Sequence, residues 1–494
     1  MNPEPVEEKT SVADAIDAKE DTKGSFFIFL EKLKKFWEKT GILPARQGTV
    51  LGLVLGMGFC IWVMAFFGTV LVHQTNLDRT SSDQQYNIDL ARESSNDWYP
   101  YRSKGIVKPL WPWVASLVVV EDDQESFIRG KILNLLLSGG FVVGVMWWSS
   151  RILPLWGVLN LGLVMGLGAL IPRGAWFQPE PLFYMAFAWA WWIGWKTLKT
   201  FRWRDFIFLG IALGVGYLAK SSTNLLLGVF FAGGILRWGW SWIERKWTGE
   251  SSWKGLHYFA GLGLALGIFG VLILPGAVYS QKKYGDPFHS WPKYWMWQDD
   301  FGSESVPFMA QYNSREKLEA MTDEEKPSMK NYFKTHSGEE AWERLSVGVS
   351  HKVWRFFVPE GKIKKPGKGK PWKQILFVRG GYLLAFLGIW VLVTGVSWTQ
   401  KGRFRMYAGT DLLQFAFVGM AFVGYSLAYG WYHPIGAGER FLLSLYAPMV
   451  LSFAVGAGIC LRERWTTSHW IQHVFGACHA LLFLCLLCRI WEVM

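Results

Sequence analysis

The sequence predicts an all-α polytopic membrane protein with about 11 transmembrane helices and two long external loops that contain interfacial helices. Hydrophobic residues make up 51% of the 494 positions, and charged residues make up 18%, against about a quarter in soluble proteins. The apolar residues fall in blocks of roughly 17–25, the length that crosses about 30 Å of hydrocarbon. The 31 tryptophans fit an aromatic belt at the two membrane surfaces.

The net charge of +12 does not indicate nucleic acid as a partner, because the Lys and Arg residues cluster beside apolar blocks. Such clusters indicate membrane topology and contact with anionic lipid. All five cysteines lie inside apolar segments. They are best interpreted as small core residues.

The first 49 residues contain two segments that are not predicted to cross the membrane. Residues 1–24 are polar and acidic without periodicity, which predicts a disordered cytoplasmic tail. Residues 25–39 (SFFIFLEKLKKFWEK) place apolar and basic residues at helical spacing. This pattern predicts an amphipathic helix on the inner membrane surface, and the alternative is a surface helix that packs on a neighbouring element.

The predicted spans divide the chain into three parts. Residues 50–279 form a first transmembrane module that includes an external loop at 74–130, residues 280–374 form a second external loop, and residues 375–494 form C-terminal membrane helices. The 11 spans are 50–73, 131–149, 153–171, 181–195, 205–219, 223–238, 255–279, 375–398, 411–430, 440–461 and 470–493.

The distribution of basic residues in short loops predicts the orientation. With a cytoplasmic N-terminus, the inner loops 196–204, 237–254, 401–405 and 462–464 hold 13 Lys and Arg residues, and the short outer loops hold 2. Basic residues favour the cytoplasmic side. The basic run at 362–373 opposes this rule, but long loops are largely exempt from it. We expect a plasma (inner) membrane protein whose long loops face the periplasm or exterior.

Ionisable residues at the outer ends of the predicted spans are candidates for a functional site. Asp83 precedes a short amphipathic stretch, so it could be a base or only a helix cap. Lys108 lies in the segment Lys108–Trp113 (KPLWPW), whose two prolines argue against a regular helix start and favour a re-entrant or interfacial segment. This lysine could bind a phosphate or extend to the membrane surface.

Three further charged residues open or close predicted spans. Glu180 stands between prolines at the mouth of the fourth span and could also be only a cap. Lys220 lies between two apolar spans and needs an anionic partner. Arg440 follows Glu439 in the segment His433–Arg440, which opens the tenth span from outside.

Taken in order, these elements resemble the GT-C superfamily of integral membrane glycosyltransferases, in particular the branch of aminoarabinose transferases and protein O-mannosyltransferases. Asp83, Ala91 and Arg92 match the family motif D-E-x-x-Y-x-x-x-A-R in register, whereas Gln84 replaces its second acid and Tyr86 is one place early. The segments Lys108–Trp113, Glu180–Phe183 (EPLF) and Gly216–Ser221 are similar to later family motifs, the last without its proline. The W-W-D-x-G motif of oligosaccharyltransferases is absent from the sequence.

The resemblance implies an inverting transfer of a sugar from a polyprenyl-phosphate donor to a lipid, glycan or protein acceptor outside the cytoplasm. Asp83 would be the general base, assisted by Glu180, because a base must take the proton of the acceptor. Lys108, Lys220 and Arg440 would bind the donor phosphate, whose growing charge needs fixed cations. The candidate substrate contacts are Tyr86, Arg102, His433 and Glu439.

No cofactor is predicted. Asp299 and Asp300 are the only candidate ligands that we identify for a divalent metal, and two adjacent acids form an incomplete set. The sequence leaves two alternative functions. A membrane glycan polymerase or ligase would place its key arginines and histidine in a large late loop. A transporter or flippase of lipid-linked sugars would place essential charges near mid-span, whereas the charges here lie at helix mouths.

Overall fold

The computed structural model describes residues 47–74, 76–103, 105–248, 255–358, 371–399, 404–436, 439–464 and 469–491. In these ranges every regular element is a helix. The predicted tail at 1–24 and the amphipathic helix at 25–39 lie outside the described residues, as does most of the basic run at 362–373.

Each of the predicted spans coincides with a helix. Among the described residues, six helical segments are long and apolar enough to cross a membrane, which is consistent with a polytopic helical membrane protein. The count of 11 spans stays a prediction. The helices are α2 (Gln47–Gln74), α5 (Asp123–Ser149), α6 (Leu155–Met165) continued by η1 (Gly166–Leu170) and α7 (Ile171–Gly174), α8 (Glu180–Thr200), α9 (Trp203–Ala219), α10 (Asn224–Thr248), α11 (Gly255–Tyr284), α17 (Pro371–Thr399), α18 (Phe404–Trp431), η5 (Glu439–Leu445) with α19 (Tyr446–Arg464), and α20 (His469–Trp491).

The long helices pack on one another through both neighbouring and distant segments. Helix α9 packs on α8 and α11, α10 packs on α18, α17 packs on α19, and α20 packs on α6. The α9–α11 contact is close because Gly210 has no side chain: a Cβ there would lie 2.6 Å from the carbonyl oxygen of Ala265. Small residues allow such close approach between membrane helices.

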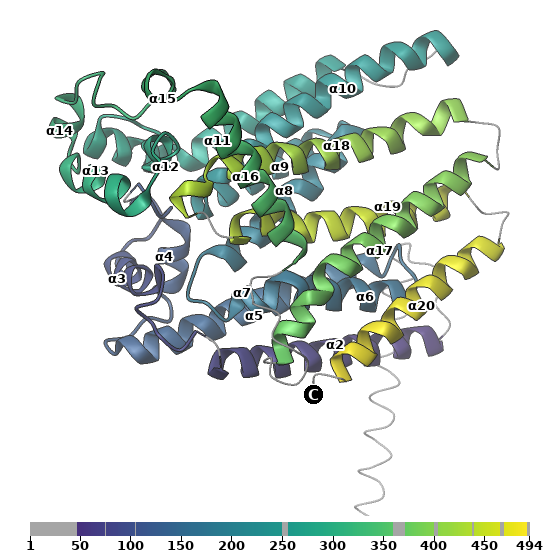
Figure 1. The fold of residues 1–494 in the computed structure, drawn as a ribbon. Helices are drawn as coiled ribbons and strands as arrows, with labels where there is room; N and C mark the ends of the chain where they lie inside the picture. The colour runs from purple at the N-terminus through teal and green to yellow at the C-terminus, as the bar shows by residue number, and fades with distance from the viewer. Residues whose placement is uncertain are drawn as a thin grey trace, which may run out of the picture.

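Short helices occupy the two predicted external loops. The first loop holds α3 (Gln84–Ser94) and α4 (Leu110–Ala115). The second holds α12 (Pro292–Trp295), η3 (Phe301–Ser305), α13 (Val306–Gln311), α14 (Arg315–Glu319), α15 (Met329–Thr335) and α16 (Gly338–Phe357). Helices α3, α4 and α12 to α15 lie at the same end of the long helices (Figure 1), so both loops contribute to one face of the protein.

One local prediction is wrong. The prolines of Lys108–Trp113 were expected to prevent a regular helix start, but α4 begins at Leu110 with Pro109 as its N-cap. Pro112 is the third residue of the helix, where no intrahelical N–H bond is lost. Trp111 is fully buried against Phe177, and this packing fixes the short helix beside the start of α8.

Candidate active site

Asp83 stands at the N-cap position of α3, but its side chain makes no capping hydrogen bond. The interpretation of Asp83 as only a helix cap is therefore wrong. Its side chain is 55% exposed, and one carboxylate oxygen lies 3.1 Å from the Arg440 guanidinium. The carboxylate is thus accessible and paired with a residue that follows it by 357 positions.

The loop before Asp83 is held in place by Gln84, the residue that replaces the second acid of the family motif. Gln84 is fully buried. Its amide donates to Asn76 Oδ1 at 2.9 Å and to the Ser81 carbonyl at 2.9 Å, and its oxygen accepts from the Phe177 N–H at 3.0 Å. The Gln84 side chain therefore joins the Asp83 loop to the segment that opens α8, which brings Asp83 towards Glu180.

Glu180 is the first residue of α8 and is 2% exposed. Its Oε1 atom accepts a hydrogen bond from Lys220 Nζ at 3.1 Å and lies 3.6 Å from Arg440 Nε. Glu180 is thus an ion-pair partner as well as an acidic group in a helix first turn. Lys220 stands between α9 and η2 (Ser221–Thr223) in an extended conformation, and its ammonium lies 3.9 Å from the centre of the Phe441 ring.

Arg440 lies in η5, directly before α19, and connects the two acids. It pairs with Asp83 and with Glu180, and its carbonyl oxygen accepts a hydrogen bond from the Tyr184 hydroxyl. Asp83, Glu180, Lys220 and Arg440 together form what we call the four-residue network. It contains two acids and two bases, so its formal charges cancel, and its members come from four separate segments of the chain.

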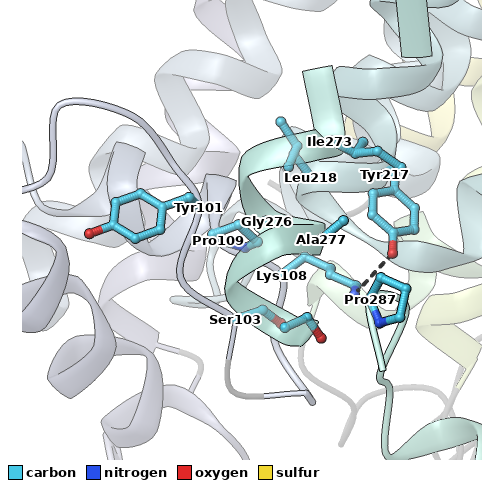
Figure 2. Close-up of a pocket in the computed structure, with 11 residues that line it drawn as sticks. Tyr101, Ser103, Lys108, Pro109, Tyr217, Leu218, Ile273, Gly276, Ala277 and Pro287 are labelled. Carbon is cyan, nitrogen blue, oxygen red and sulfur yellow. Dashed lines mark hydrogen bonds between the residues drawn. The ribbon is translucent and has the colours of Figure 1, made fainter. Parts of the chain in front are cut away.

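Lys108 lies apart from the four-residue network in a pocket between the α4 segment, α9 and α11 (Figure 2). Its ammonium lies 3.3 Å from the Tyr217 hydroxyl and 4.8 Å from the centre of that ring. Among the described residues, no carboxylate lies within ion-pair distance of it. Burial lowers the pKa of Lys108 to about 8, although Asp286 opposes the shift. Lys108 is 7% exposed and has an aromatic hydroxyl as its neighbour instead of a counterion.

Among the candidate substrate contacts, Tyr86 is within electrostatic reach of Asp83, whereas Arg102 and His433 have no described contact with the four-residue network. Tyr86 lies on α3, and burial raises its pKa to about 12. Arg102 pairs with Asp97 at 3.1 Å. His433, in η4 (His433–Ile435), lies beside the His351 ring at 4.6 Å. The side chain of Glu439 is outside what the structure describes.

The two acids considered for a metal have other partners. Asp299 pairs with Arg344 at 2.8 Å and with His336 at 2.9 Å, and Asp300 caps η3 by accepting from the Ser303 N–H at 2.6 Å. No group of three or more His, Cys, Asp or Glu side chains suited to a metal ion occurs in the described ranges. These contacts hold the second external loop together and do not define a metal site.

Two neighbours of the four-residue network were not predicted from the sequence as site residues. Phe441 lies under the Lys220 ammonium, and Tyr429 lies 5.4 Å from Phe441, ring centre to ring centre. Phe441 directly follows Arg440, and Tyr429 lies one helical turn after Tyr425 near the end of α18. The spacing of Tyr425 and Tyr429 by one helical turn was the sequence signal for Tyr429. An aromatic residue at the end of a span is, however, usually assigned to the membrane interface.

No family model matches the chain, and no curated protein sequence matches it. The chain is similar to solved structures of an oligosaccharyltransferase from Archaeoglobus fulgidus. The apo form has a TM-score of 0.47 and 11% identity, over 89% of this chain and 55% of that chain. The form in complex with an inhibitory peptide and a dolichol-phosphate has a TM-score of 0.43 and 12% identity, over 88% of this chain and 55% of that chain.

This chain therefore spans about half the length of the oligosaccharyltransferase that it matches. The GT-C superfamily and its aminoarabinose and O-mannosyl branch stay predictions from the sequence motifs.

Proposed function

We propose that the protein is an inverting membrane glycosyltransferase that moves a sugar from a polyprenyl-phosphate donor to an acceptor on the non-cytoplasmic side. The observation that carries the proposal is the four-residue network. Its members come from the ends of separate predicted spans and are joined by direct contacts: Arg440 with Asp83 and Glu180, and Lys220 with Glu180. An accessible carboxylate beside two fixed cations suits a reaction that needs a base and releases a phosphate.

In the proposed reaction the acceptor hydroxyl attacks the anomeric carbon of the donor sugar. The O–H proton passes to Asp83 as the new C–O bond forms. The bond between the anomeric carbon and the phosphate oxygen breaks on the opposite face, and its electron pair leaves with the polyprenyl phosphate. Lys220 and Arg440 would stabilise the charge that develops on this leaving group.

The ion pairs suggest how the base would be activated. Arg440 contacts Asp83 at 3.1 Å. A donor phosphate would compete with Asp83 for the guanidinium, because both are anions that the same donors recognise. Donor binding would thus release the Asp83 carboxylate towards the acceptor hydroxyl.

The position of the network favours the transferase over a transporter of lipid-linked sugars. Asp83 precedes α3, Glu180 begins α8, Lys220 follows α9, and Arg440 precedes α19. These charges lie at helix ends, whereas a transport pathway would need ionisable groups near mid-span.

Mass spectrometry of the purified protein tests the donor class. We expect a co-purified polyprenyl phosphate, or binding of an added polyprenyl-phosphate sugar that bare phosphate does not reproduce. A wild-type protein that retains no isoprenoid phosphate and binds none when it is added would contradict the proposal.

Accessibility labelling tests the proposed side of the membrane. Cysteine or glycosylation tags at residues 100, 320 and 435 should report the outside, and tags at 200, 245 and 403 should report the cytoplasm, because the short basic loops are predicted to lie inside. A cytoplasmic signal at residue 320 would overturn the assigned orientation.

A further inference from the structure

Three buried polar atoms near the Glu180–Lys220 pair have no hydrogen-bond partner outside this set among the described residues. They are Glu180 Oε2, the Ser222 hydroxyl oxygen and the Tyr429 hydroxyl oxygen. Glu180 is 2% exposed and Tyr429 is 7% exposed. Buried polar groups in native proteins are nearly always hydrogen-bonded, so three such atoms near one ion pair indicate a place where a polar ligand or water binds.

These atoms come from three elements and converge on one region. The Ser222 and Tyr429 hydroxyls are close enough to hydrogen-bond to each other, which leaves one O–H of the two free to donate, and Tyr429 is within electrostatic reach of Glu180. The Tyr425 hydroxyl donates to the Ser222 carbonyl at 3.0 Å, which holds η2 against α18. The Tyr429 ring contacts Phe441, which in turn lies under the Lys220 ammonium.

The chemistry of the three atoms selects hydroxyl groups over phosphate. A carboxylate oxygen only accepts hydrogen bonds, whereas the two hydroxyls donate and accept. A phosphate diester has no donor for Glu180 Oε2 and would be repelled by its charge. Sugar hydroxyls both donate and accept, and they can satisfy all three atoms.

We propose that Glu180 Oε2, Ser222 and Tyr429 form a subsite for the hydroxyl groups of the donor's sugar. This inference rests on the proposed function, because it requires a glycosyl donor whose phosphate lies beside Lys220 and Arg440. It assigns Glu180 two tasks: Oε1 positions the cations, and Oε2 contacts the sugar. Ser222 and Tyr429 are then specificity-determining residues.

Binding measurements with three matched lipids test the subsite. The full chain in lipid nanodiscs is titrated with a polyprenyl phosphate and with its glucose and mannose phosphodiesters, using intrinsic tryptophan fluorescence. Tyr429→Phe and Ser222→Ala each remove a hydroxyl with little change in shape. We expect each to weaken binding of at least one sugar phosphodiester about tenfold and to leave the polyprenyl phosphate unaffected. Tyr258→Phe is the matched control, because that hydroxyl already donates to the Phe230 carbonyl, and its affinities should equal those of the wild type.

The outcomes separate the two proposals. If the wild type binds the sugar phosphodiesters and both variants bind them equally well, water alone satisfies the three atoms and the subsite is refuted while the donor class survives. Equal loss for the polyprenyl phosphate and its sugar esters would also refute the subsite. If the wild type binds neither lipid class, the proposed function fails, and the subsite fails with it.

Discussion

Two arginine-centred clusters of this protein show how a structural cluster differs from a reactive one. In the second external loop, Arg344 pairs with Asp299 and donates to the carbonyls of Met296, Gln298 and Trp431. In the four-residue network, Arg440 pairs with Asp83 and Glu180. In the Arg344 cluster, each of the three guanidinium nitrogens donates at least one hydrogen bond. Both clusters expose a carboxylate, since the side chains of Asp299 and Asp83 are 45% and 55% exposed. Asp299 has a partner on each oxygen, whereas Glu180 has one oxygen without a hydrogen-bond partner in the described ranges.

The two clusters differ in whether their polar groups already have hydrogen-bond or ion-pair partners. This difference separates the structural cluster from the reactive one. Arg344 is buried, with aromatic rings of Tyr332 and Trp431 beside its guanidinium, and its contacts fasten the external loop to the end of α18. A fully satisfied buried network stabilises one conformation. The four-residue network retains polar atoms that can bind a ligand. Substitutions in the two clusters should therefore have different effects.

The largest expected effect is on the reaction rate in Asp83→Asn. The substitution keeps the side-chain shape and removes its basicity, so we expect transfer to slow by about 10²–10⁴-fold with donor binding retained. The measurement is single-turnover transfer from a polyprenyl-phosphate sugar to the acceptor. Asp299→Asn in the structural cluster, and Asp78→Asn and Asp89→Asn near Asp83, should keep most of the activity. Wild-type turnover in Asp83→Asn would remove Asp83 as the base.

Lys220→Met should have the next largest effect, on stability. Glu180 is buried and would keep only its longer contact with Arg440, so the loss should approach about 3–5 kcal/mol, the order of magnitude for removing one partner from a buried ion pair. We expect a clear decrease in the melting temperature of the purified protein. The double variant Glu180→Gln/Lys220→Met removes both charges and should recover most of the loss. A double variant no more stable than Lys220→Met would show that the ion pair is not the cause.

Arg344→Ala tests the structural role of the Arg344 cluster. It leaves the carbonyls of Met296, Gln298 and Trp431 without their donor, at about 1–3 kcal/mol for each buried group that water cannot reach. Amide hydrogen exchange should become faster in α15 and α16, with little change in donor affinity. The matched control is Arg315→Ala, an exposed i,i+4 pair with Glu319, which should change stability by less than about 0.5 kcal/mol. Equal exchange in both variants would contradict the structural role of Arg344.

The smallest expected effect is a pH dependence of donor binding from Lys108, which lies outside the four-residue network and would act as an additional cation for the donor phosphate. Because burial lowers the Lys108 pKa to about 8, the ammonium is charged below that pH and neutral above it. A bound phosphate raises this pKa, so affinity should be constant below about pH 8 and fall up to tenfold per unit above it. Lys108→Met should bind more weakly and lose this dependence. A flat wild-type profile up to about pH 9.5 would exclude Lys108 from the phosphate site.

Local patterns were sufficient to predict the helices. Apolar blocks of membrane length and the short amphipathic stretch after Asp83 are encoded in neighbouring residues, and α2, α3 and α11 appear where those patterns lie. The start of α4 was missed because tertiary packing of Trp111 compensates for the two prolines.

Only part of the site could be predicted from the sequence. Basic residues in short loops placed Asp83, Glu180, Lys220 and Arg440 on one predicted face, but no local pattern indicates that Arg440 bridges the two acids. The separation of Lys108 from Lys220 also depends on packing, because Tyr217 takes the contact with the Lys108 ammonium. The role of Gln84 could be recognised only once the loop around it was visible.

The bridge from Asp83 to Arg440 also sets an order of assembly during synthesis. The two residues are 357 positions apart, so a nascent chain that has already inserted α8 and α9 still lacks the cation that holds Asp83. The site is therefore completed only when the start of α19 reaches the membrane. Premature termination anywhere before that point would leave a fragment without Arg440 and therefore with an incomplete site.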